Sequence, residues 1–139
     1  MSSQFGTISV QGLYNISTGQ ITTTQTLSTT TPTQMTSMTL AAPPAGTYLV
    51  FFDGTVQTGT GGNSVTTYYY LGTVATGESR NIQFPTATLI DSGYPFTMAM
   101  HAVLTVNGSQ NINVYWSTTA SAAQQSTFLN RRLSAIKVG

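Results

Sequence analysis

The chain has 139 residues, enough for one domain that buries about two-thirds of its unfolded surface. It has no cysteine, which excludes a disulfide framework and a thiolate metal site. Only 5% of the residues are charged and the formal net charge is +1, too little for a surface that binds phosphates, so nucleic acid is not an expected partner.

Threonine and serine supply the polar character that charged residues usually provide. The hydrophobic fraction of 40% and the regular spacing of the aliphatic runs argue against disorder and favour an all-β domain. No apolar run reaches the roughly 18 residues of a membrane span, and the first twelve residues lack the features of a secretion signal. Membrane insertion is therefore not expected.

The N-terminal third begins with short alternating pieces and ends in a strand. Residues 1–20 predict either a small hairpin or the last turn of a fibre stalk, and residues 21–139 predict the head domain. Residues 21–31 are of low complexity and predict an edge strand or an extended segment laid over the sandwich. Residues 34–40 alternate loosely and predict a short strand.

Residues 45–56, AGTYLVFFDGTV, form the densest apolar run of the chain. A proline pair precedes the run and a glycine-rich segment, 59–63, follows it. One face of the predicted strand carries Tyr48, Val50, Phe52 and Val56, and the other carries Leu49 and Phe51. Since both faces are apolar, each needs a cover, and the strand is predicted to lie centrally in a sandwich or under a neighbouring subunit.

Three consecutive tyrosines stand in the next predicted strand, residues 64–74. Alternation places Tyr69 on one face and Tyr68 and Tyr70 on the other. One set can fill the core, while the hydroxyl groups of the other need water or a partner surface. A polar turn at residues 77–80 and a short strand at 82–84 are expected to follow.

Residues 96–106 show the strictest alternation, and the Asn107-Gly108 pair that follows is a strong hairpin signal. The expected return strand, 111–117, places Trp116 in the core opposite the apolar stripe of 96–106. A last strand is expected at 127–138. The chain thus predicts an all-β jelly-roll or related sandwich of about eight to ten antiparallel strands.

Three stretches, PPAGTYLVFFDGTV, MAMHAVLTVNGSQNINVYW and TFLNRRLSAIKV, resemble one family. They are similar to the trimeric jelly-roll heads of the tumour necrosis factor and complement globular-head superfamily, in the version found at bacterial and bacteriophage fibre tips. The resemblance covers roughly residues 30–139. The last stretch departs from the aromatic terminal strand of complement-type heads, so no ligand or calcium site is carried over.

The resemblance implies a homotrimer, and the residues allow one. Strands that are apolar on both faces, in a chain with few charges, need more cover than one sandwich supplies. A cyclic trimer would supply that cover and protect the sheet edges. The expected trimer interface consists of Tyr68, Tyr69, Tyr70, Phe51, His101 and Phe128.

The residues do not predict an enzyme, a cofactor or a metal site. The three acids, Asp53, Glu78 and Asp91, stand in one strand and two separate loops, so no hydrolytic carboxylate pair is expected. A nucleophilic triad would need the lone His101, but the sequence has no Gly-x-Ser-x-Gly nucleophile elbow. His101 is interpreted as a hydrogen-bonded residue near a surface or subunit contact; alternatively, three copies would meet on the axis and bind a metal or an anion.

Asp53 interrupts an apolar strand and, if buried, needs a donor, for which Arg131 and Arg132 are the first candidates. Binding residues are expected in loops: Asp91, Ser92 and Tyr94 in one loop, and Asn63 in the glycine-rich segment. A carboxylate acceptor beside an aromatic face suits a sugar.

The sequence therefore favours a non-enzymatic trimeric fibre-tip or adhesin head that attaches to a host or prey cell through a glycan or other envelope component. Three weak sites on one head would add by multivalency. The expected location is extracellular, at a cell surface or a virion fibre tip. Two alternatives stay open: a purely structural trimerisation or capping module, and a monomeric carbohydrate-binding sandwich attached to an enzyme.

Overall fold

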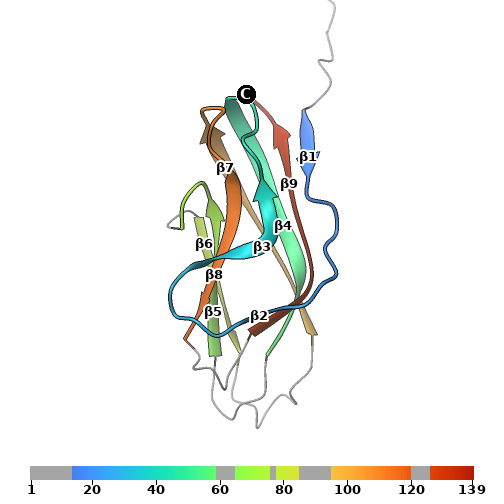
Figure 1. Ribbon diagram of the computed structural model, residues 1–139, viewed down its shortest axis with the longest axis vertical. Coiled ribbons are helices and arrows are strands. Elements are labelled where there is room, and N and C mark those ends of the chain that lie inside the picture. The colour runs from blue at the N-terminus through green and yellow to red at the C-terminus, as the bar shows by residue number, and fades with distance from the viewer. Residues whose placement is uncertain (1–13, 59–64, 76–77, 85–94, 120–125) are drawn as a thin grey trace, which may run out of the picture.

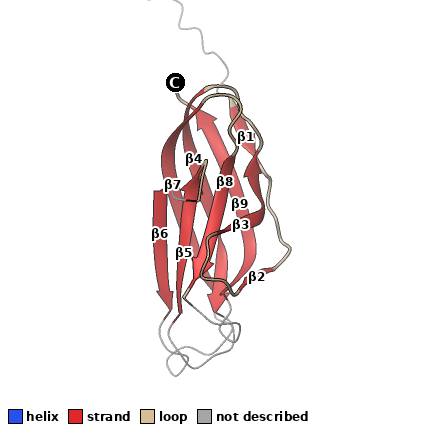
Figure 2. Ribbon diagram, turned by 60° about the vertical axis from the view of Figure 1, so that its left-hand side comes forward, coloured by secondary structure: helices blue, strands red, loops and turns tan. Residues whose placement is uncertain are grey.

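A computed structural model describes residues 14–58, 65–75, 78–84, 95–119 and 126–139. All regular structure in these residues is β-strand, arranged as two antiparallel sheets packed face to face (Figure 1, Figure 2). No helix long and apolar enough to cross a membrane occurs in this part of the chain. The prediction of an all-β sandwich is confirmed.

The first sheet has the strand order β1-β9-β4-β7, and β2 pairs with the other end of β9. Its strands are β1 (Asn15–Ser17), β2 (Gln25–Leu27), β4 (Gly46–Thr58), β7 (Pro95–Val106) and β9 (Ser126–Lys137). The second sheet has the order β3-β8-β5-β6. Its strands are β3 (Thr33–Leu40), β5 (Val65–Gly72), β6 (Glu78–Phe84) and β8 (Ile112–Thr118).

This strand order is that of a jelly roll. From β2 onward, successive strands change sheet at every connection except the β5–β6 pair, which is a hairpin within the second sheet. Strands of the sheet β1-β9-β4-β7 therefore alternate along the sequence with strands of the sheet β3-β8-β5-β6, while each sheet forms a separate layer. The nine strands of the described residues agree with the expected eight to ten.

The core lies between the sheets and is rich in large side chains. Tyr69 of β5 stacks on Trp116 of β8 with ring centroids 6.4 Å apart, and it also lies 6.4 Å from Phe52 of β4 in the opposite sheet. All three are fully buried. Alternation separates Tyr69 from Tyr68 and Tyr70 but does not say which set is buried. The prediction of Trp116 in the core is confirmed.

β4 is central in the first sheet, as predicted, with β7 along one side and β9 along the other. Its inward residues are fully buried, but on its outer face Phe51 is 38% exposed and Leu49 is partly exposed. Within one chain, β4 is therefore covered on its inner face only, and the cover expected from a neighbouring subunit on the other face stays a prediction. The sandwich supplies one cover, since the core lies on one side of each sheet.

The Asn107-Gly108 turn does not form the predicted hairpin. β7 pairs with β4 in the first sheet, whereas β8 pairs with β3 and β5 in the second, so residues 107–111 cross between the sheets. The local turn is present, with Gly108 at φ 92° and the Asn107 side chain bonded to Ser109. Likewise, residues 78–80 extend β6 instead of forming a turn, because they pair with β5.

Residues 18–32, here called the strap, connect β1 to β3 along the edge of the sandwich (Figure 1). Ile21 exchanges two backbone hydrogen bonds with Arg131 of β9, and β2 pairs with the beginning of β9. The prediction of an extended or edge segment over the sandwich is confirmed. β1 also pairs with β9, which places Asn15–Ser17 in the first sheet, and residues 1–13 lie outside the described residues.

Candidate functional site: the outer faces of the two sheets

The outer face of the first sheet carries a cluster that we call the apolar face: Leu49, Phe51, Val103 and Ile136. The strand register sets it, because Leu49 of β4 pairs with Val103 of β7 on one side and with Ile136 of β9 on the other. Val103 is 65% exposed. His101 is exposed beside the cluster, directly opposite Phe51. An exposed apolar cluster of this kind is suited to binding another protein surface.

The same sheet becomes polar further along β4. A pocket of about 220 Å³ opens there, lined by Gln20, Asp53, Gly54, Thr55, Thr97, Asn130, Arg131 and Arg132. Asp53 and Arg132 form an ion pair at 3.4 Å, with side chains 43% and 54% exposed, respectively. Each charge is thus partly balanced by the other and by water, so the pair holds no unpaired charge for a ligand.

Of the two arginines predicted as partners of Asp53, the structure selects Arg132. The expected reason for this pairing was burial of the carboxylate, but Asp53 is not buried. Arg131 points to the other side of β9 and is 2% exposed. Its guanidinium donates to the carbonyl oxygens of Thr23 at 2.7 Å and Thr36 at 3.0 and 3.2 Å, and burial lowers its pKa.

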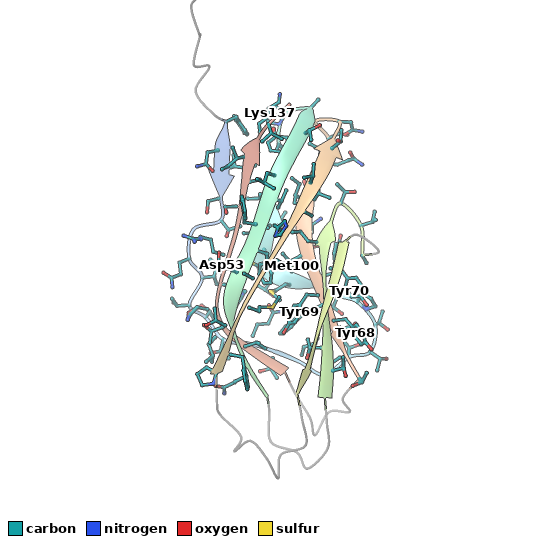
Figure 3. All side chains as sticks on the ribbon, turned by 180° about the vertical axis from the view of Figure 1, so that it is seen from behind. Asp53, Tyr68, Tyr69, Tyr70, Met100 and Lys137 are labelled. Atoms are coloured by element: carbon teal, nitrogen blue, oxygen red, sulfur yellow. The ribbon has the colours of Figure 1, made fainter. Side chains whose placement is uncertain are left out.

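The outer face of the second sheet carries tyrosines and amides. Tyr70 of β5 pairs directly with Tyr115 of β8, and Tyr68 pairs with Ser117. The three tyrosine side chains are partly exposed. Figure 3 shows Tyr68 and Tyr70 on the outer side of β5 and Tyr69 on the inner side. We call Tyr68, Tyr70 and Tyr115 the tyrosine face.

A chain of side-chain hydrogen bonds borders these rings. Gln34 donates to Thr39 at 2.5 Å, Thr39 donates to Asn113 at 2.9 Å, and Asn113 donates to the hydroxyl of Tyr115 at 3.3 Å. The register of β3 shifts between Gln34 and Thr39, where Ser37 has a φ of 62°. Such irregularities redirect side chains, and this one accompanies the contact between Gln34 and Thr39.

The residues predicted for the trimer interface separate into groups. Phe51 and His101 lie together on the outer face of the first sheet, and Tyr68 and Tyr70 lie on the outer face of the second. Tyr69 is a correction: it is fully buried in the chain's own core and is not on the surface. Burial raises the pKa of its hydroxyl, and a hydrogen bond with Thr67 opposes that shift.

The remaining predicted residues cannot be placed in either face. Phe128 lies in β9 opposite Val56 and Gln25, and its side chain is outside the described part. Asp91, Ser92, Tyr94 and Asn63, the expected ligand-binding residues, also lie outside the described residues.

Sequence reasoning missed Tyr115 as a surface residue. It lies between Val114 and Trp116, which are buried, and an alternation count that begins at Trp116 places it outward. What periodicity could not provide is its neighbour Tyr70, because the β5–β8 pairing joins strands that are more than 40 residues apart. Val103 and Ile136 lie on either side of Leu49, and periodicity could not predict this either, because both pairings join strands far apart in the sequence.

Comparisons with known proteins concern the fold alone. The sequence matches no protein-family model and no curated protein. Among solved structures, Eiger TNF from S. frugiperda is 11% identical over 78% of this chain and 69% of that chain, with a TM-score of 0.47. The VP2 subviral particle of infectious bursal disease virus is 13% identical over 91% of this chain, with a TM-score of 0.46. The Gx strain of the same virus is 14% identical over 91% of this chain, with a TM-score of 0.47. The chain spans about a third of the length of the two viral chains.

Proposed function

We propose that this protein is a non-enzymatic, homotrimeric jelly-roll head of a fibre tip or adhesin, and that it attaches to a ligand on a host or prey cell. The observation that carries the proposal is the apolar face, which a single chain leaves open to water. Only 5% of the residues are charged, so the rest of the surface has few charges that would keep single chains apart in solution. The resemblance to tumour necrosis factor and complement-type heads supports the same assembly and an extracellular location.

The position of the apolar face also supports self-association. β7 is an edge strand of the first sheet, and Val103 lies on it. A neighbouring copy placed over Leu49, Phe51 and Val103 would cover the apolar side chains and lie against the open edge of β7. Three such contacts close into a ring, which covers the β7 edge of every copy and prevents open-ended growth through this surface.

The experiment that tests the assembly is light scattering after size-exclusion chromatography, with one substitution on the apolar face. The wild-type chain is expected at about three times 14.7 kDa, unchanged on dilution. Val103→Glu places a charge in the interface and is expected to give a 14.7 kDa species. The matched control is Val74→Glu, since Val74 follows β5 and is 57% exposed. A wild-type monomer at all concentrations would overturn the trimer.

Attachment is tested separately by binding of the fluorescently labelled trimer to bacterial and eukaryotic cells. Saturable binding that unlabelled trimer displaces is expected, and it should weaken strongly for the Val103→Glu monomer because multivalency is lost. A trimer that binds none of the cells would leave the structural capping role as the better description of the protein.

A further inference from the structure

We propose that the tyrosine face is a binding platform for a neutral glycan. This inference rests on the proposed attachment function and names the surface and ligand class that carry it. It moves the ligand from the loop ends to the outer face of the second sheet. It also assigns Tyr68 and Tyr70 to ligand binding instead of the trimer interface.

The first argument is the spacing of the rings. Tyr70 and Tyr115 are directly opposed across β5 and β8, so their Cβ atoms lie about 4.5–5.5 Å apart. Tyr68 is two residues from Tyr70 on the same face, about 7–8 Å from Tyr115 on the diagonal. The three tyrosines thus lie side by side on one face of two neighbouring strands. The C–H face of a pyranose packs on such rings, while the phenol hydroxyls stay available to its hydroxyl groups.

The second argument is preorganisation. The chain of hydrogen bonds from Gln34 through Thr39 and Asn113 ends on the Tyr115 hydroxyl. Asn113 is 5% exposed, so its amide is held by the protein and not by bulk water. Tyrosine loses little side-chain entropy on binding, and a ring whose hydroxyl is already fixed loses less. The exposed amide of Gln34 and the partly exposed hydroxyl of Tyr115 suit the alternating C–H and O–H groups of a sugar.

The third argument is charge. The described side chains of this face are uncharged. A surface without formal charge offers a charged ligand no partner for an ion pair. A neutral ligand needs no such partner and breaks no existing ion pair when it binds. The chemistry therefore matches a neutral, hydroxyl-rich ligand.

The two outer faces are on opposite sides of the sandwich, so they can be occupied at the same time. The apolar face, with aliphatic side chains and Phe51, fits a second copy of this chain. The tyrosine face, with hydroxyls and amides, fits a glycan better than it fits that apolar surface, because its polar groups would be left unpaired there. A trimer closed through the first sheet thus presents three tyrosine faces outward.

The test is binding of the intact wild-type protein to an array of neutral glycans (β-glucan, α-mannan and galactan oligosaccharides) and acidic glycans (polygalacturonate and polysialic acid). Binding to at least one neutral class is expected. The glycan that binds is then titrated against four variants by saturation-transfer difference NMR and isothermal titration calorimetry. Mass and thermal melting of each variant are recorded first, so that a folding defect is recognised.

Tyr68→Ala and Tyr70→Ala are each expected to weaken binding about tenfold or more, as aromatic anchors of an interface do. Tyr70→Phe keeps the ring and should stay within about threefold. Tyr14→Ala is the matched control: Tyr14 is an exposed tyrosine that packs against Tyr48 beside the first sheet, and its loss should leave the affinity unchanged.

Two results would overturn the inference while the proposed function stands: unchanged glycan affinity in Tyr68→Ala and Tyr70→Ala, or a trimer that binds cells but no neutral glycan. Dissociation of the trimer by Tyr70→Ala would also overturn it, because the tyrosines would then belong to the subunit interface. A wild-type monomer that still binds a neutral glycan through these tyrosines would overturn only the trimer.

Discussion

Tyr69 links the two sheets through its ring. It contacts Trp116 within the second sheet and Phe52 in the first, and its hydroxyl is buried with it. A buried phenol keeps its proton to a higher pH in the folded state than in the unfolded chain. Because the folded pKa is raised, the stabilisation is complete below the ordinary value of 10.0 and is lost as the pH rises above it.

We therefore expect the free energy of unfolding to fall as the pH rises from about 9 to 11, by about 1.4 kcal/mol for Tyr69 at the upper end. Tyr69→Phe should remove that part of the decrease. A smaller decrease should persist, because burial also raises the pKa of Tyr48. Urea unfolding at several pH values measures both proteins. An equal decrease in the two would mean that Tyr69 is not the group responsible.

Gly46, at the start of β4, has little room for a side chain. Its φ is 150°, and a Cβ there would overlap the side chain of Lys137 and the backbone carbonyl oxygen of Gly139. That oxygen accepts a hydrogen bond from Thr47 at 2.7 Å, so it cannot shift without loss.

Gly46→Ala is thus expected to destabilise the fold by about 2 kcal/mol, from backbone strain together with the displaced C-terminus. Gly19→Ala is the comparison, since Gly19 also has a positive φ, 71°, but no heavy atom lies within 4 Å of the added Cβ. It should cost only about 1 kcal/mol of backbone strain. Thermal and urea unfolding of both variants measure the difference, and equal losses would argue against crowding at Gly46.

At the scale of elements, the strap depends on one side chain of β9. Arg131 bonds to strap and strand carbonyls, at Thr23 and Thr36, while its backbone bonds to Ile21. A charged donor shared among carbonyl oxygens forms stronger hydrogen bonds than a neutral one. The guanidinium therefore fastens a segment that has only Ile21 and Leu27 as aliphatic anchors.

Arg131→Met should destabilise the protein by about 2 kcal/mol, because the carbonyl groups lose their donors. It should also speed hydrogen exchange at the amide of Ile21. Arg132→Met removes an adjacent arginine whose ion pair is exposed, and it should change stability by less than about 1 kcal/mol. Similar losses for both variants would show that the strap does not depend on Arg131.

At the scale of the whole molecule, the scarcity of charge has a measurable consequence. Neither the apolar face nor the tyrosine face contains a charged residue among its described side chains. The mass should therefore stay that of a trimer, and the glycan affinity should change less than about twofold, between about 50 mM and 500 mM NaCl. Light scattering and calorimetry at the two salt concentrations test this. A steep loss of glycan affinity with salt would instead implicate the charged pocket at Asp53 and Arg132.

The sequence alone determined the strands and their two faces. Alternation is a local property, so Trp116 could be assigned to the core, and β4 to the centre of a sheet, before any pairing was known. For Tyr69, alternation gave a face but not whether that face is core or surface, and its assignment to the trimer interface was wrong. Low charge and apolar content likewise indicated an uncovered surface. The same local rule left Arg132 and Arg131 equivalent as partners of Asp53, although only one lies on the same face as the carboxylate.

Only the tertiary structure decided which strands are neighbours. The Asn107-Gly108 turn could serve a hairpin or a crossing between sheets, because a turn signal states where the chain reverses and not which sheet it enters. Pairing is set by burial over the whole domain, between strands far apart in the chain. For that reason the apolar face and the tyrosine face, each assembled from residues of several strands, emerge from the fold and could not be read from any single stretch of sequence.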